Sequence, residues 1–401
     1  MMKKFLISFL ICSIILSGCG SQHEINEMSI IIGVGIDMVD DSTYQLTLQI
    51  VNPSAIVAGG NTTSGPKAVP IINVVGKGQT VVDALQSATT KVSRPNFYAH
   101  LSLIVIGQAL AEKGILEVLD TFERDSQVRQ NTPVLIARNE MAFDVLNTLT
   151  ALTNIPVVSL IGKIRNVQNL FGETVDIKLY ELISSFEDEK TVPILSGATA
   201  PKDDPFAGSQ SNIEQSSPLT SKVNGIAVFH KNGKLNYWID DELARTTLLL
   251  RNDLKETIYS EKCGKNKHIS LNVSYSKSDS SVKFFGKKPL LSVNAYLEGN
   301  IDSNGCSDIT LSKDEDYKKI EQKVSKDIKN NIKQLLNVTE KHQSDFLGFG
   351  QSIRIHNPKE WKKIKSSWPE TYSKADMKVK VEFHINNSGS TRNHMKVDEQ
   401  D

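Results

Sequence analysis

The sequence lacks an excess of charge of either sign. Lysine plus arginine and aspartate plus glutamate number 46 each, and 39% of the 401 residues are hydrophobic. This composition is typical of a globular protein rather than a disordered one, and the length allows two or three domains. The charge balance gives no electrostatic reason to expect nucleic acid or an anionic bilayer as the main partner.

Local motifs for catalysis, metal binding and phosphate binding are also missing. GVGID, residues 33–37, begins like a dinucleotide fingerprint, but Met38 stands where a third glycine belongs. GKGQT, residues 76–80, lacks the Lys-Ser/Thr ending of a phosphate-binding loop. The eight histidines show no metal-ligand spacing, and no G-x-S-x-G elbow occurs. We therefore expect no enzyme, cofactor or metal site, although catalytic groups that converge from distant positions would leave no local motif.

A further absence concerns apolar runs after residue 19, since none approaches the roughly 20 residues that a membrane-spanning helix needs. An apolar run is present before residue 19. Two lysines precede residues 5–16, a run that is apolar apart from two serines and is itself too short to span a bilayer. The pattern predicts a secretory signal peptide over residues 1–18.

Cys19 makes this signal unlike an ordinary one. LSGC, residues 16–19, matches the bacterial lipoprotein pattern, in which the thiol receives a diacylglycerol and becomes the new N-terminus. The alternatives are an unmodified cysteine after an ordinary signal, or a buried helix over residues 5–16. We expect an acylated Cys19 to anchor the mature chain to the outer face of a lipid bilayer.

Cys263 and Cys306 remain once the signal is removed and Cys19 carries lipid. An even pair in an exported protein favours a disulfide. Two separate thiols are the alternative, because the sequence does not show whether the Cβ atoms come within reach.

The N-terminal half predicts alternating strands and helices. Thr80 is a helix N-cap with Asp83 at N3, and a second helix is predicted over 109–122. Residues 58–70, rich in Gly, Thr and Ser, predict a loop. This succession favours an α/β arrangement. Strands are predicted over residues 29–36, 44–50, 101–107 and 134–137.

The C-terminal half contains three strictly alternating segments, typical of antiparallel strands with one face on a core: residues 269–275, 291–297 and 377–385. A helix over 313–339, opened by a capping box of Ser312 and Glu315, has apolar positions every three or four residues. At 1.5 Å per residue it would be roughly 40 Å long and could cover the sheet. Core packing is the expected role of its apolar stripe, and contact with a partner helix is the alternative.

Trp361 and Trp368 fall on one face of a further helix that is predicted to begin after Asn357, with Pro358 at N1. Two of the three tryptophans therefore share a stripe. The stripe is either an aromatic contact patch for a partner or a core helix that seals the sheet. Trp361 and Trp368 are the candidate partner contacts.

These patterns predict a multidomain protein of mixed α+β and α/β class, each domain a mainly antiparallel or mixed sheet packed with helices. Residues 201–220 are rich in Pro, Ser and Gly and poor in large apolar residues. The expected divisions are an N-terminal α/β region over 19–198, which has room for two subdomains, a linker or long loop over 199–220, a C-terminal α+β domain with the long amphipathic helix over 221–390, and a disordered tail over 391–401.

Several segments resemble, in the same order, the C-subunit lipoproteins of spore nutrient germinant receptors, the Ger(x)C family. They are ILSGC, EINEMSIIIGVGID, QIVNP, GKGQTVVDALQSAT, HLSLIVIGQALAEKGI, GIAVFHKNGKL and GFGQSIRIHNPKEWKKIKSSW. The likeness runs from Cys19 to about residue 389. Many relatives have CWDRRE where this chain has CGSQHE, so any role of that tryptophan and basic pair does not carry over.

The resemblance implies a non-enzymatic lipoprotein, without a cofactor, on the outer face of the inner spore membrane. It also implies two integral membrane partners, an A-type and a B-type subunit, with which the chain makes spores germinate on a nutrient. It further implies three α/β-type domains, and only Cys19 carries over as an assigned residue. A lipid-anchored solute-binding protein and a surface hydrolase are the alternatives.

Overall fold

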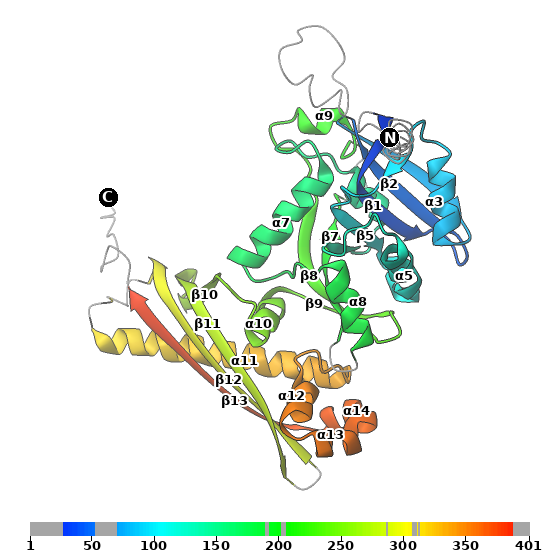
Figure 1. Cartoon of the computed structure of the whole chain (residues 1–401). Helices are drawn as coiled ribbons and strands as arrows, with labels where there is room; N and C mark the ends of the chain where they lie inside the picture. Colours follow the sequence, from blue (N-terminus) through cyan, green and yellow to red (C-terminus); the bar gives the residue numbers. More distant parts are fainter. Residues whose placement is uncertain are drawn as a thin grey trace, which may run out of the picture.

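The computed structural model describes residues 27–52, 70–188, 192–201, 206–285, 288–306, 311 and 313–387. These residues form two sheets with helices around them, and the mixed α+β fold class predicted from the sequence is confirmed (Figure 1). Several sequence predictions fall outside the described residues: the signal peptide at 1–18, Cys19, nearly all of the 58–70 loop, Ser312 of the capping box, and the tail at 391–401.

Nine strands within these residues form the first sheet, in the order β3-β2-β1-β5-β6-β7-β8-β9, with β4 paired to β1. Strands β1, β5, β6 and β7 run parallel to one another, while β2, β3, β8 and β9 add antiparallel pairs at the two sides. The strands are β1 (Ser29–Met38), β2 (Tyr44–Val51), β3 (Ile71–Gly78), β4 (Asn96–Phe97), β5 (Leu103–Gly107), β6 (Val134–Ala137), β7 (Ile194–Thr199), β8 (Lys222–Phe229) and β9 (Leu235–Ile239).

Helices cover both faces of this sheet. On one face Ile104 and Ile106 of β5 pack with α3, α4, α5 and α8, and on the other Leu103 and Val105 pack with α6 and α7. A strand buried on both faces must be apolar at every position, which explains the unbroken run in β5. The helices are α3 (Val81–Thr89), α4 (Gln108–Lys113), α5 (Leu116–Arg124), α6 (Ala142–Asn147), α7 (Pro156–Leu170), α8 (Leu179–Glu187) and α9 (Gln210–Ile213).

The structure tests two of the helix predictions. Thr80 caps α3, because its side chain accepts a hydrogen bond from the Asp83 N–H, as predicted. The single helix predicted over 109–122 is divided into α4 and α5 at Gly114, whose φ is 133°. Only glycine adopts that backbone angle without strain, so the helix ends there.

The segment 199–220 connects two strands of the same sheet. β7 and β8 pair directly, with Leu195 opposite Ala227, and the sheet continues to the end of β9. The segment is therefore a long connection that contains α9, and it does not link separately folded sheets. Its Pro, Ser and Gly content is typical of a surface loop. Such composition does not show whether the strands before and after the loop belong to the same sheet.

The second sheet has the order β10-β11-β12-β13 and carries the long helix α11 (Asp314–Lys341) across one face. The strands are β10 (Thr257–Gly264), β11 (Lys267–Phe285), β12 (Lys288–Asn304) and β13 (Asp376–Asn387). Ile320, Val324 and Ile328 of α11 are buried against the strands, so the apolar stripe of the predicted helix packs in the core.

The direction of β13 corrects the expectation of antiparallel strands. β13 runs parallel to β12, with Leu291 opposite Met377, because α11 and the helices after it carry the chain back to the end of the sheet where β12 begins. Strict alternation shows that one face of a strand is buried, and it is the same for either direction. The helices that complete this crossover are α12 (Phe349–His356), α13 (Pro358–Ile364), the 3₁₀ turn η2 (Lys365–Ser367) and α14 (Trp368–Tyr372).

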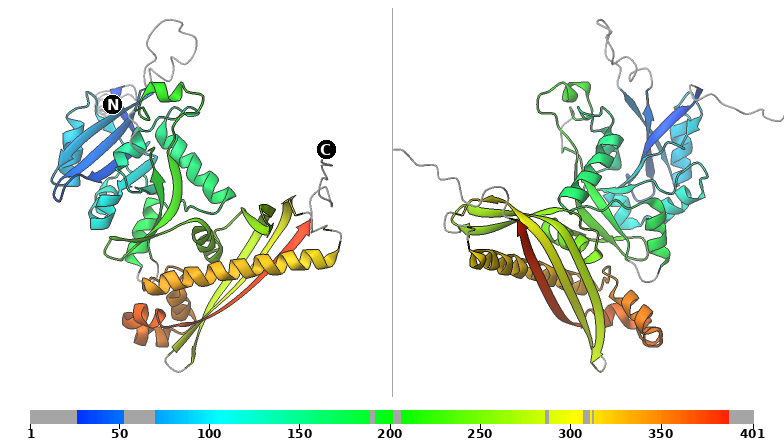
Figure 2. Two further views of the ribbon diagram at one scale, coloured as in Figure 1. Left: turned by 180° about the vertical axis from the view of Figure 1, so that it is seen from behind. Right: turned by 60° about the vertical axis from the view of Figure 1, so that its left-hand side comes forward.

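Helix α10 (Asp241–Arg251) joins the two sheets (Figures 1 and 2). Its Leu248 and Leu249 are fully buried in an apolar cluster that includes Ile226 of the first sheet and Leu271 of the second. Asn252, in the left-handed conformation just after α10, donates to the Ser278 carbonyl at 2.9 Å and accepts from its N–H at 2.7 Å. We call the first sheet with its helices the first lobe, and the second sheet with its helices the second lobe. The two lobes share one apolar core, and the Asn252–Ser278 hydrogen bonds connect the end of α10 to the second lobe.

We expect Gly76→Ala to lower the free energy of unfolding by about 1–3 kcal/mol. A Cβ at Gly76 would lie 2.1 Å from the Ala84 carbonyl oxygen and 2.2 Å from the Ala88 nitrogen, so α3 would have to move away from β3. Gly162→Ala is the matched control in α7, because nothing lies within 4 Å of its Cβ position. Helix propensity predicts a gain of roughly 0.5–1 kcal/mol there. Urea unfolding that gave the same change for both variants would contradict this account of the α3 contact.

Candidate functional site

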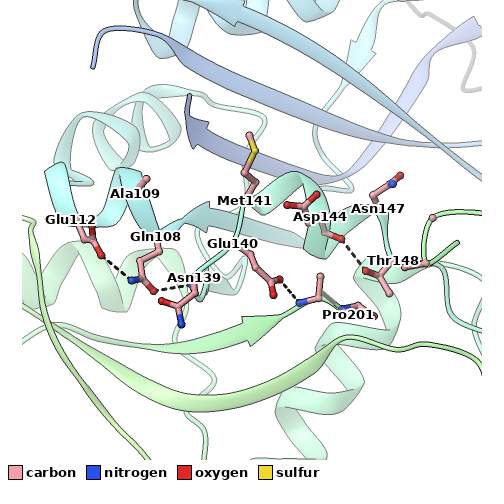
Figure 3. A pocket seen from close by; sticks show the side chains of 13 residues that line it. Gln108, Ala109, Glu112, Asn139, Glu140, Met141, Asp144, Asn147, Thr148 and Pro201 are labelled. Carbon is pink, nitrogen blue, oxygen red and sulfur yellow. Dashed lines mark hydrogen bonds between the residues drawn. The ribbon is translucent and has the colours of Figure 1, made fainter. Parts of the chain in front are cut away.

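A cleft of about 970 Å³ lies at the carboxyl ends of β5, β6 and β7 (Figure 3). Helix α4 forms one wall, the start of α6 forms another, and the residues that follow β7 close a third side. The lining residues are Gln108, Ala109, Glu112, Asn139, Glu140, Met141, Asp144, Asn147, Thr148, Ala200, Pro201, Ala207 and Gly208.

The topology explains why the cleft lies at this edge. The chain leaves β5 into α4 on one face of the sheet, and it leaves β6 into α6 on the other. Two neighbouring parallel strands whose connections diverge leave a crevice outside their carboxyl ends, which is where open α/β sheets bind ligands. The position of the cleft is therefore that of a ligand site, and its lining decides what it can hold.

Hydrogen bonds hold several lining side chains in place (Figure 3). Gln108 donates to Glu112 at 2.8 Å and accepts from the Asn139 N–H at 2.9 Å. Glu140 accepts from the Ala200 N–H at 2.5 Å, which ties α6 to the residues after β7. Among the described residues, the lining combines carboxylates and amides without lysine, arginine or histidine, so it offers mainly acceptors to a small polar or cationic solute.

Asp37 lies beneath the cleft and fixes the start of α6. Its side chain is only 1% exposed, and it accepts hydrogen bonds from the N–H groups of Ala142 at 2.6 Å and Phe143 at 3.1 Å. A Cβ at Gly107 would lie 2.1 Å from the Asp37 carboxylate, so glycine at the end of β5 makes room for it. Burial raises the pKa of Asp37 to about 6, although the two N–H groups oppose this shift. Asp37 is a positioning residue.

Trp361 and Trp368 are buried, with 8% and 5% of their surfaces exposed, and their rings pack edge to face at 6.0 Å. Little of either ring is exposed, so their burial contradicts the predicted partner contact and supports the core alternative. The spacing of the two residues did predict a shared face. Spacing alone does not show whether that face meets the protein's own sheet or another molecule.

Asp345 organises this aromatic cluster. Its carboxylate accepts hydrogen bonds from Trp368 Nε1 at 2.8 Å, Phe349 N–H at 3.0 Å and Gly350 N–H at 2.6 Å. Burial raises its pKa to about 6, against the opposing effect of these donors. Gly348, with φ of 83°, makes the turn into α12.

Cys263 and Cys306 form a disulfide in the structure, with Cα atoms 6.0 Å apart. This separation lies within the range of natural disulfides. The bridge joins Cys263, near the end of β10, to Cys306, the second residue after β12, at one end of the second sheet.

The described residues contain neither a cluster of metal ligands nor a helix suited to span a membrane. No group of three or more His, Cys, Asp or Glu side chains in these ranges is arranged to hold a metal ion. Among the helices described, none has both the length and the apolar character to cross a bilayer.

Comparison with known families covers most of the chain. Residues 21–199 match the family described as spore germination protein N-terminal domain, and residues 224–389 match the family described as spore germination B3/GerAC like, C-terminal. The two matches meet at the long connection between β7 and β8.

Full-length relatives are found among curated proteins. Spore germination protein KC of Bacillus subtilis (strain 168) is 30% identical, over 99% of this chain and 98% of its own length. Spore germination protein B3 of the same organism is 22% identical, over 97% of this chain and 98% of its own. The crystal structure of the GerBC protein shares the fold, with a TM-score of 0.58 and 18% identity over 88% of this chain and 97% of that one.

Removing the Asp37 side chain tests its role in the cleft wall. We expect Asp37→Ala to lower the free energy of unfolding by about 1–3 kcal/mol at pH 8, because it leaves two N–H groups of α6 without an acceptor. Asp144→Ala is the control, since that carboxylate is exposed and makes no hydrogen bond with a described residue. It should change stability by less than about 0.5 kcal/mol. Equal effects in chemical unfolding would argue against the assigned role.

The pKa of Asp345 predicts a pH response in the aromatic cluster. Because the folded pKa of about 6 lies above the ordinary value of 3.8, the folded state binds this proton more tightly. The contribution of Asp345 to the free energy of unfolding therefore rises as the pH falls from about 6 toward 4, and it is lost as the pH rises through 6. Tryptophan fluorescence should titrate with a midpoint near 6, and Trp368→Phe should abolish the step. A midpoint near 4 would refute the burial argument.

Proposed function

The chain belongs to the GerAC-like family of spore germination proteins, and from this membership we propose that it is the lipid-anchored, non-enzymatic C-type subunit of a nutrient receptor that triggers spore germination. The observation that carries the proposal is the similarity over the full length to spore germination protein KC, together with matches to both domains of the family. A match of this extent includes both lobes and the helix that joins them.

The partners in this proposal are two integral membrane subunits, an A-type and a B-type. Relatives of this chain carry the names spore germination protein A3, B3 and KC, which suit the third members of such sets. The chain's own contribution is a folded body with exposed faces, held beside the membrane subunits on the outer face of the inner spore membrane.

Attachment to that membrane is assigned to Cys19. Nine residues lie between it and Ser29, the first residue of β1. At about 3.3–3.6 Å per residue this tether spans at most roughly 35 Å, so the first lobe stays close to the bilayer. Acyl chains on Cys19 supply the binding energy, at ~0.8 kcal/mol per buried methylene.

A non-enzymatic role is supported by the chemistry of the cleft. Among the described residues that line it there is no histidine, cysteine, serine or lysine, and the one hydroxyl, on Thr148, donates to the backbone carbonyl of Asp144 rather than to a side-chain base. Its acceptors suit the solute-binding alternative better than the hydrolase one. The full-length similarity to spore germination proteins nevertheless favours a receptor subunit over an independent solute-binding protein.

We expect Cys19→Ala to release the chain from the membrane fraction and to abolish the germination response to nutrient, because the replacement removes the thiol that takes the lipid. Cys12→Ala is a matched control, since it removes the other cysteine of the leader and leaves LSGC intact. Spores with either variant are compared by membrane fractionation and by the fall in optical density after nutrient addition. Normal fractionation and germination with Cys19→Ala would refute the anchor.

A further inference from the structure

Residues 354–365 form a strongly basic surface on a chain whose net charge is zero. They include five lysine or arginine residues and one histidine, against the single acid Glu360. We call this surface the α12–α13 basic face. Its exposed members are Arg354, Ile355, His356, Lys359, Lys362, Lys363 and Lys365.

Three of the five lysine and arginine residues on this face have no ion-pair partner among the described residues. Lys363 pairs with Glu360 at 3.1 Å, whereas Arg354, Lys359 and Lys362 form no ion pair with a described residue. Like charges this close repel one another and create a local positive potential. An acidic partner would remove the repulsion and gain from the potential.

Contacts with the core fix the helices that carry this face. Asn357 caps α13 by accepting the Glu360 N–H, and Trp361 packs against Trp368, whose Nε1 donates to the buried Asp345. The cations therefore project from helices whose positions are already fixed. A partner that binds here orders side chains only, which lowers the entropic cost of association.

An apolar residue lies among the cations. Ile355 is 61% exposed, between Arg354 and His356. Ile355 thus adds an exposed apolar side chain beside the cations, and protein interfaces combine apolar and charged contacts in this way.

The place of the face in the molecule also favours a protein. The short tether from Cys19 enters the first lobe at β1, whereas α12, α13 and α14 lie at the opposite end of the molecule from β1 and β2 (Figures 1 and 2). The bilayer that holds the tether is therefore near the other end. A partner that rises from the membrane beside the chain can reach the basic face.

We propose that the α12–α13 basic face docks an acidic segment of a protein partner within the receptor, with Ile355 at the centre of the contact. This inference rests on the proposed function, because it takes the partner to be another subunit of the same complex. It adds the surface through which this subunit is recognised and the charge of the segment that it meets.

A photo-crosslinking residue in place of Ile355, in intact spores that carry the full-length chain, tests the proposal. The expected product joins position 355 to one protein, at a peptide rich in aspartate and glutamate. A product with lipid alone, or with a peptide poor in acidic residues, overturns the proposal. Spores without this chain that germinate normally would instead overturn the proposed function.

Charge reversal supplies the matched comparison. The triple variant Arg354→Glu, Lys359→Glu and Lys362→Glu should lower the crosslinking yield by about tenfold, the sum of three modest exposed charge pairs. The control reverses the same amount of charge at three exposed lysines elsewhere on the second lobe: Lys255→Glu, Lys277→Glu and Lys283→Glu. It should leave the yield unchanged, and equal yields for the two triple variants contradict the proposal.

The salt dependence of the crosslinking yield, measured without the charge-reversal substitutions, tests the proposal even where the triple variant does not fold. In isolated spore membranes, the yield from position 355 should fall steeply between about 0.1 and 1 M KCl, where the screening length shortens from about 10 to 3 Å. A yield that is independent of salt overturns the electrostatic contact even if the triple variant is unfolded.

Discussion

The arrangement of the molecule depends on the burial of α10 between the two sheets. Leu248 and Leu249 are fully buried, and Arg245 on the same helix donates to Glu173 at 2.9 Å and stacks over Tyr259 with 5.2 Å between guanidinium and ring. Apolar surface removed from water on several sides of a helix is difficult to separate again. The cleft on the first lobe and the basic face on the second are therefore parts of one body.

Each lobe uses a buried aspartate in the same way. Asp37 accepts the first N–H groups of α6, and Asp345 accepts the first N–H groups of α12 together with the indole of Trp368. In both places burial raises the carboxyl pKa to about 6 while the donors oppose the rise. A carboxylate saturated by backbone donors has little capacity left for a substrate. The raised pKa values report burial, and the hydrogen bonds to the first N–H groups of α6 and α12 assign both aspartates to helix positioning.

Local patterns in the sequence predicted the local structure well. The strands at β1, β2, β5 and β6, the cap at Thr80 and the span of α11 all depend on neighbours within a few residues, and they were found. Asp37 was missed because its partner Ala142 lies 105 residues away. The parallel direction of β13, the continuity of the sheet across 199–220 and the burial of Trp361 and Trp368 depend equally on distant contacts. No periodicity reports such contacts.

The overall charge balance was misleading about the kind of partner that the chain can bind. Equal numbers of acidic and basic residues removed any electrostatic reason to expect an anionic partner, and that argument holds for the molecule as a whole. A binding surface, however, responds only to charges within about a screening length, near 8 Å at physiological salt. The segment 354–365 contains five lysine or arginine residues against one acid, and Arg354, Lys359 and Lys362 form no ion pair with a described residue, so its local charge differs from the balance of the whole chain. Net charge therefore constrains solubility and long-range steering, and the distribution of charge over the folded surface decides which partner can dock.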